Sequence, residues 1–201
     1  MLLTDRLVVE MKVVAFNGSA RKDGNTAMLI RHVLEILEKE GIKTELIQLA
    51  GEQIHSCMAC GTCRKIKNKE CKIVNDKVNL YIQKMAEADG VIFGSPTYFS
   101  MMSSEMKALI DRAGFVAKSN DDLFKQKVGA AIVAVRRAGG IPTFDAINNF
   151  FLINQMIIPG SSYWNVGIGL NKGDVEKDEE GIKTMEDLGR NMAWLLKKIK
   201  P

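Results

Sequence analysis

The chain has 201 residues and is 46% hydrophobic, which is enough to build one domain with a sizeable core. Its 28 basic and 24 acidic residues leave a net charge of +4 on a mixed surface, which argues against binding to nucleic acid. Apolar runs are too short for a membrane helix, and Asp5, Arg6 and Glu10 interrupt the N-terminus where an export signal would be apolar. We therefore expect a single cytoplasmic domain over residues 1–201, and we assign residues 1–11 no role.

Strand and helix patterns alternate along the chain. Short apolar runs typical of buried parallel strands occur at 12–16, 45–49, 90–94, 127–135 and 156–159. Helical apolar spacing occurs at about 26–37, 76–88, 103–112, 143–155 and 182–199. This alternation predicts an α/β fold with a doubly wound, five-stranded parallel sheet and right-handed crossovers. Ligands are then expected beyond the carboxyl ends of the strands.

The loop after the first strand, residues 18–26, has the composition of an anion site. Ser19, Arg21, Asn25 and Thr26 offer hydroxyl, cationic and amide groups at the start of a helix, where a phosphate is favoured. The spacing fits neither a P-loop nor a G-x-G-x-x-G dinucleotide fingerprint. A polar connection in which Asn25 or Thr26 merely caps the helix is the alternative.

The loop after the third strand carries aromatic residues on a stiffened turn. Pro96 restricts the backbone that presents Thr97, Tyr98 and Phe99 at the strand end. Aromatic side chains on a rigid loop can stack on a flat heterocycle. Ordinary packing in the core is the alternative for either aromatic residue.

All four cysteines fall within residues 57–71, in an insertion after the second strand. Thiolates are soft ligands that suit zinc or an iron–sulfur cluster, and Cys57-x-x-Cys60-x-x-Cys63 followed by Cys71 is compact enough for one self-contained site. Structural zinc, a regulatory disulfide and a metal-free remnant are the alternatives, although a reducing cytoplasm disfavours disulfides. His55 is a possible substitute ligand or a neighbour of the ligands.

Three motifs together carry a resemblance to a known family. G-S-x-R-x-x-G-N-T at 18–26, G-S-P-T-Y-F at 94–99 and K-A-L-I-D-R at 107–112 resemble the NADPH-dependent FMN reductase group of flavodoxin-like proteins. With the cysteine segment added, the chain looks like the iron–sulfur flavoproteins of that group, over about residues 12–160. The resemblance implies a flavodoxin-like fold with a cysteine-bearing loop insertion.

The resemblance also implies particular cofactor contacts. The FMN phosphate would be held by Ser19, Arg21, Asn25 and Thr26. The isoalloxazine ring would lie against residues of two later loops, Pro96, Thr97, Tyr98, Phe99, Ala138, Gly139 and Gly140. A [4Fe-4S] cluster would be ligated by the cysteines Cys57, Cys60, Cys63 and Cys71.

The sequence hypothesis is an FMN-dependent oxidoreductase that relays electrons between a [4Fe-4S] cluster and the flavin, with small-molecule or ferredoxin-type donors and acceptors. The alternatives are a cluster-free NAD(P)H-dependent FMN or quinone reductase and a non-catalytic electron carrier or redox sensor. No catalytic acid–base residue is assigned. The resemblance further implies a homodimer or homotetramer, with Met101, Met102 and Phe115 as apolar surface near the ring loop.

Overall fold

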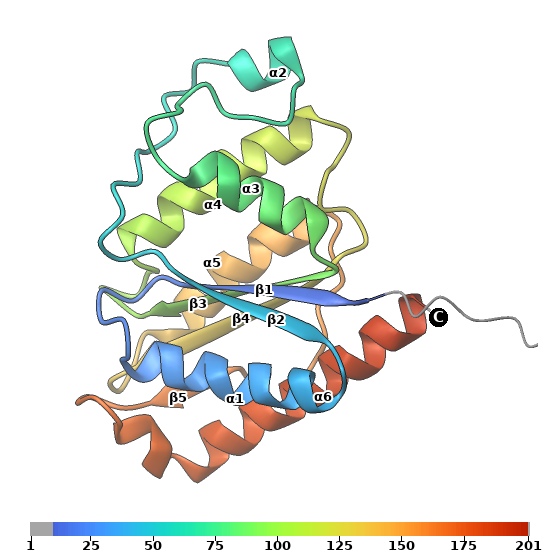
Figure 1. Cartoon of the computed structure of the whole chain (residues 1–201). Helices are drawn as coiled ribbons and strands as arrows, with labels where there is room; N and C mark the ends of the chain where they lie inside the picture. The colour runs from blue at the N-terminus through green and yellow to red at the C-terminus, as the bar shows by residue number, and fades with distance from the viewer. Residues whose placement is uncertain (1–9, 201) are drawn as a thin grey trace, which may run out of the picture.

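A five-stranded parallel sheet forms the centre of the computed structural model, which describes residues 10–200 (Figure 1). Its strands are β1 (Lys12–Asn17), β2 (Lys43–Gln48), β3 (Gly90–Pro96), β4 (Val128–Val135) and β5 (Val166–Ile168). They lie in the order β2-β1-β3-β4-β5, and each neighbouring pair is parallel. This order is that of flavodoxin-like folds, in which the direction of winding reverses between β1 and β3. The predicted fold class is confirmed.

Helices cover both faces of the sheet (Figure 1). One face packs against α3 (Val78–Glu87), α4 (Ser104–Ser119) and α5 (Gly140–Ile153). The other face packs against α1 (Asn25–Lys39) and α6 (Glu179–Ile199), which follows the 3-10 helix η1 (Asp174–Lys177). The short α2 (Thr62–Ile66) lies outside these layers and contacts α4. Within residues 10–200, no helix has the length and apolarity needed to cross a membrane.

The central strands are buried on both faces because each face has its own core. Every residue of β4 is buried, and its small and β-branched side chains leave room for the helices to approach closely. Phe93 of β3 stacks on Phe151 of α5 with ring centroids 5.3 Å apart. A Cβ at Gly129 would lie 2.7 Å from the Phe151 ring, so this glycine makes room for the helix. The rigid sheet holds the loops at its carboxyl edge in fixed positions.

The prediction of a last strand at 156–159 is wrong. Ile157 forms a single parallel bridge with Val128 at the beginning of β4, and Pro159 has no N–H group with which to continue a ladder. The fifth strand is instead Val166–Ile168, which pairs with the carboxyl half of β4. Only Met156 and Pro159 of this apolar run are buried, and Ile157 is 38% exposed. A strand also needs a continuous row of backbone partners.

Two helix boundaries also differ from the sequence prediction. Helix α4 continues past Arg112 to Ser119, because its apolar spacing persists through Ala113, Val116 and Ala117. Helix α5 begins at Gly140 rather than at residue 143. Pro142 is tolerated there because it lies in the first turn, where the backbone N–H has no intrahelical partner.

Candidate functional site

Three loops meet at the carboxyl edge of the sheet, after the adjacent strands β1, β3 and β4. The first loop begins against β3, because the Gly18 N–H donates to the Gly94 carbonyl at 2.8 Å. The second and third loops touch where Gly139, at φ +83°, approaches Ser100, and a Cβ at Gly139 would lie 2.6 Å from the Ser100 hydroxyl. The fold therefore brings together the three sequence segments predicted to bind FMN.

The first of these loops presents an uncapped helix N-terminus. Gly24 is the N-cap of α1, and no side chain caps the helix, so neither Asn25 nor Thr26 has the capping role considered above. Ser19 is buried; its hydroxyl accepts a hydrogen bond from the Arg21 N–H at 3.1 Å, and the Arg21 residue is exposed. The first N–H groups of a helix lack intrahelical partners and favour an anion.

Asn25 and Thr26 also have structural roles that the sequence did not reveal. The Asn25 amide donates to the Asn171 carbonyl at 2.9 Å and accepts from the Gly173 N–H at 2.8 Å, which fastens a distant loop to the start of α1. The Thr26 side chain is buried beside Gly94 of β3. Because both side chains have other contacts, the backbone N–H groups of Asn25 and Thr26 are the groups left to bind a phosphate.

The second loop is a tight turn that holds its aromatic residues out of the core. Tyr98 and Met101 exchange two backbone hydrogen bonds of 2.8 and 3.0 Å, and Phe99 and Ser100 between them have φ values of +50° and +62°. Such left-handed conformations are costly for residues with a Cβ and concentrate at functional sites. Phe99 is fully exposed at 103%, and Tyr98 is 46% exposed, so neither packs in the core of this chain.

Several polar atoms of these loops have no hydrogen-bond partner among residues 10–200. The Thr97 hydroxyl is buried and has no hydrogen-bond partner among the described residues, as expected for a group that waits for a ligand. Helix α5 starts at an N-cap, Gly139, that has no side-chain capping bond, so a second helix N-terminus offers free N–H groups at this edge. Ala138, Gly139 and Gly140 also line a cavity of about 260 Å³ beside Tyr163 and Trp164.

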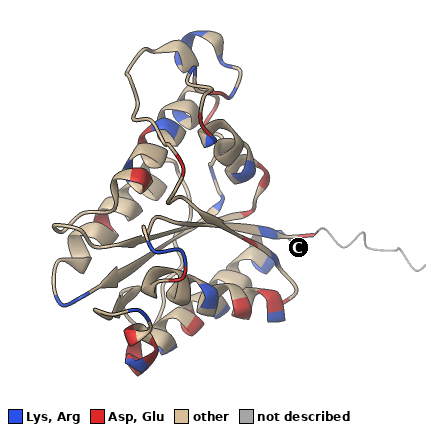
Figure 2. Cartoon of the chain, turned by 60° about the vertical axis from the view of Figure 1, so that its left-hand side comes forward, with Lys and Arg blue, Asp and Glu red and all other residues tan. Residues whose placement is uncertain are grey.

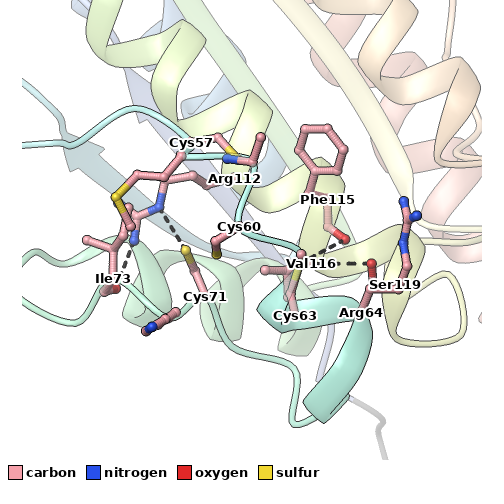
Figure 3. Close-up of a pocket in the computed structure, with 14 residues that line it drawn as sticks. Cys57, Cys60, Cys63, Arg64, Cys71, Ile73, Arg112, Phe115, Val116 and Ser119 are labelled. Atoms are coloured by element: carbon pink, nitrogen blue, oxygen red, sulfur yellow. Dashed lines mark hydrogen bonds between the residues drawn. The ribbon is translucent and has the colours of Figure 1, made fainter.

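All four cysteines line one cavity of about 150 Å³, together with residues of α4 (Figure 3). The Cys63 Sγ lies 3.9 Å from both the Phe115 carbonyl oxygen and the Ser119 hydroxyl. Within residues 10–200, no three His, Cys, Asp or Glu side chains are placed closely enough to hold a metal ion. The fold thus collects the four thiols in one place without closing them into a coordination sphere.

A buried ion pair anchors the segment that carries the cysteines. Arg112 of α4 pairs with Asp76, and both side chains are at most 1% exposed. The same guanidinium donates to the Cys71 Sγ at 3.3 Å, to the His55 carbonyl at 3.2 Å and to the Ile73 carbonyl at 2.9 Å. One side chain of α4 therefore holds both ends of the segment 55–76, which we call the cysteine lobe.

Sequence reasoning did not assign Arg112 a role, although a signal for it was present. Arg112 lies on the same face of α4 as the buried Leu109 and Val116, which are three and four positions away. A charged residue within an apolar helical stripe is seldom fully buried unless it is paired. That placement could have predicted a buried partner, but the sequence did not say which of the chain's carboxylates it would be.

The electrostatics of the lobe follow from these contacts. Burial alone would raise the pKa of Asp76, but the hydrogen bond from Arg112 and the backbone N–H groups of His55 and Val78 hold it below its ordinary value. The pKa of Cys60 is lowered by hydrogen bonding to Thr62, which favours the thiolate form that ligates metals.

The two other residues considered near these sites lie differently from expectation. The His55 ring is 3.2 Å from the Asn75 amide nitrogen, as a neighbour of the cysteine segment rather than in its cavity. Of the apolar residues expected near the ring loop, Met102 is buried, whereas Phe115 lies at the cysteine cavity. Phe115 belongs to the carboxyl half of α4, and this helix runs from the sheet edge to α2 in the lobe (Figure 1).

Comparisons with known proteins agree with this arrangement. The NADPH-dependent FMN reductase family matches residues 11–171. An iron–sulfur flavoprotein of Methanocaldococcus jannaschii is 38% identical over 202 aligned positions, which cover 94% of this chain and 100% of the relative. An iron–sulfur flavoprotein of Methanosarcina thermophila is 30% identical over 191 positions, which cover 94% of this chain and 97% of the relative.

A solved structure supports the fold. A flavodoxin, WrbA-like protein from Agrobacterium tumefaciens superposes with a TM-score of 0.65 at 14% identity, over 94% of this chain and 98% of that one. The strand order, the three converging loops and the family match are mutually consistent. The chain therefore belongs to the iron–sulfur flavoprotein group of the NADPH-dependent FMN reductase family and is a flavin-dependent oxidoreductase with a flavodoxin-like fold.

Proposed function

We propose that this protein is a cytoplasmic FMN-dependent oxidoreductase in which a [4Fe-4S] cluster on the cysteine lobe exchanges electrons with the flavin. The observation that carries the proposal is the convergence of all four cysteines on one cavity in a chain that also forms the three FMN-reductase loops. FMN supplies two-electron chemistry, and a cluster supplies one-electron chemistry. Small molecules or ferredoxin-type proteins would be the donors and acceptors.

The residues at the sheet edge would bind and orient the flavin. The free N–H groups at the start of α1, with Ser19 and the exposed Arg21, would hold the phosphate through charge-assisted hydrogen bonds. The Thr97 hydroxyl would find its missing partner on the cofactor. Tyr98 and Phe99 would cover a face of the ring and exclude water from it, because the turn points them away from the core.

The lobe would hold the cluster through Cys57, Cys60, Cys63 and Cys71. Arg112 would keep Cys71 in place and donate a hydrogen bond to its sulfur, a contact of the kind that tunes cluster potentials. Ser103, the N-cap of α4, lies beside Gly18 of the first loop, and Phe115 of the same helix lines the cysteine cavity. The two residues are twelve positions apart, which along a helix is a rise of about 18 Å. The two sites of one chain are therefore separate, and α4 connects them.

The exposed turn also supports an oligomer. Tyr98, Phe99 and Met101 leave apolar surface uncovered at the flavin edge, and we propose that a homodimer or homotetramer covers it. Sedimentation of the FMN-loaded protein gives the oligomeric state. A Phe99→Ser variant is expected to weaken assembly while its flavin loops fold as before, and a monomeric wild type contradicts the proposal.

The proposed function is tested by cofactor analysis of protein purified without oxygen. Iron, sulfide, zinc and FMN are measured on one sample, and four irons with one FMN per chain are expected. Cys63→Ala is expected to lose iron and sulfide but keep FMN, because the flavin loops and all buried residues of both cores lie outside the lobe, and Cys63 only packs against one core as a partly buried side chain. Ser119→Ala, which changes the cavity wall without removing a thiol, is the matched control.

Full FMN with zinc or with no metal would make the protein a cluster-free NAD(P)H-dependent FMN or quinone reductase. Cofactors without turnover would indicate a carrier or redox sensor.

A further inference from the structure

The net positive charge of the chain is concentrated on the cysteine lobe. Residues 57–72 contain five basic residues and one acidic residue, Glu70. This surplus of four equals the net charge of the whole chain, +4, so the remaining residues balance to zero. Asp76 does not offset the lobe's surface charge, because it is buried against Arg112. The cations are Arg64, Lys65, Lys67, Lys69 and Lys72.

These five cations differ from most charges elsewhere on the surface. All five are exposed, and none forms a salt bridge within residues 10–200. The surface of α6, by contrast, pairs Lys183 with Asp187 and Arg190 with both Glu186 and Asp187. In Figure 2, Lys and Arg lie along α2 and the loop beside it, at the far end of the molecule from α6. Unpaired like charges repel one another, so these cations lower the stability of the lobe unless an anionic partner binds to them.

The lobe also exposes apolar side chains among these cations. Met58 and Ile66 are each 63% exposed, and Phe115 of α4, which lines the cysteine cavity together with Met58, is 49% exposed. Helix α2 contributes no buried residue to either core, so its fold within this chain does not explain its apolar side chain at Ile66. An apolar centre with a charged rim is the usual anatomy of a protein–protein interface, whereas nucleic-acid surfaces are more polar throughout.

We propose that the cysteine lobe is the docking surface for an acidic, one-electron carrier protein. Carboxylates of the partner would face these five cations, and apolar side chains of the partner would cover Met58 and Ile66. This inference rests on the proposed function, because the carrier would exchange electrons with the cluster beneath the surface. Each encounter with a reduced carrier moves one electron from the carrier, which is oxidised, to the lobe. Two encounters, with two protons from solvent, would reduce one FMN.

The test compares two variants of the FMN-loaded protein purified without oxygen. Lys65→Gln/Lys69→Gln removes two lobe cations, and Lys39→Gln/Lys198→Gln removes two exposed cations that form no salt bridge in residues 10–200, at the ends of α1 and α6. Each is titrated calorimetrically with an acidic ferredoxin as the probe, and the rate of electron transfer from that reduced ferredoxin is measured over a range of salt concentrations. Iron and FMN are measured in every sample.

We expect the lobe variant to lose roughly tenfold in second-order rate constant and affinity at low salt, since steering raises on-rates by about 10 to 10³. The control variant should keep wild-type values, and the lobe variant and wild type should converge as salt screens the charges. NADPH-driven flavin reduction should not change in either variant.

Several results would overturn the docking proposal. Equal losses of affinity in both variants, or binding that does not depend on salt, would exclude steering by the lobe cations. Displacement of the ferredoxin by a DNA oligonucleotide would make the surface a nucleic-acid site. A changed oligomeric state of the lobe variant alone would make the lobe an interface between copies of this chain. Calorimetric binding does not need a cluster. If iron-free protein binds the ferredoxin in a salt-dependent way, the docking proposal is supported and the proposed electron relay is wrong.

Discussion

Arg112 provides the sharpest test of how the lobe is held. Arg112→Met removes the guanidinium but keeps a long apolar side chain of similar reach. It leaves Asp76 buried without its cation, and removing one partner of a buried ion pair costs roughly 3–5 kcal/mol. The carbonyls of His55 and Ile73 and the sulfur of Cys71 also lose their donors. A large local destabilisation is therefore expected.

That destabilisation should stay within the lobe. Residues 55–76 pack on the outer side of α4, and α2 buries no residue, so the lobe can open while both faces of the sheet keep their cores. The free energy of global unfolding can fall by no more than the lobe contributes to it. If the lobe is destabilised further, it unfolds on its own while the sheet and its helices stay folded. The amides of Lys69 and Cys71, which are hydrogen-bonded to Asn120 and Asn79, report on the lobe.

Hydrogen exchange measured by mass spectrometry distinguishes local from global effects. Protection in 55–76 should fall by at least 100-fold in Arg112→Met, while peptides from β3 and β4 keep theirs, since 1.4 kcal/mol is a factor of ten. Lys107→Met is the matched control on the same helix, because its exposed pair with Asp111 is worth about 0–1 kcal/mol. Unchanged lobe protection in Arg112→Met, or an equal loss in the sheet, would refute the reasoning.

Three further predictions concern the flavin edge and the lobe. Arg21→Ala should weaken FMN binding by about 1.5–3 kcal/mol, seen as a roughly 10- to 100-fold higher Kd in fluorescence titration; an unchanged Kd removes Arg21 from the phosphate site. Gly139→Ala should lower both FMN affinity and Tm, because alanine at φ +83° is strained by about 1–3 kcal/mol and its Cβ would press on Ser100; unaltered affinity in the folded variant would show that the loops are not coupled. The pKa of Asp76 is lowered on folding, so its ionised form stabilises the protein above its unfolded pKa of about 3.9 and this gain is lost as pH falls. The stability difference between wild type and Asp76→Asn should therefore shrink below about pH 4 in urea unfolding, and a difference that grows in acid would show that Asp76 is not ionised in the folded protein.

The sequence alone determined the fold class and the location of both candidate sites. Apolar runs such as 90–94 and 127–135 identify buried strands because a parallel sheet covered on both faces must be apolar throughout. Alternation with helices then fixes a doubly wound sheet, and the loops after the strands become the candidate sites. These are local patterns, and each can be recognised within about ten residues.

Only the tertiary structure decided which distant residues meet. The fifth strand is 166–168 rather than 156–159, because pairing depends on which segment reaches the free edge of β4 with its N–H groups available. The Arg112–Asp76 pair joins residues 36 positions apart, and Asn25 holds a loop 146 positions away. Periodicity reports whether a side chain faces the core, but the identity of its partner depends on how the helices pack, and that is settled by the whole chain.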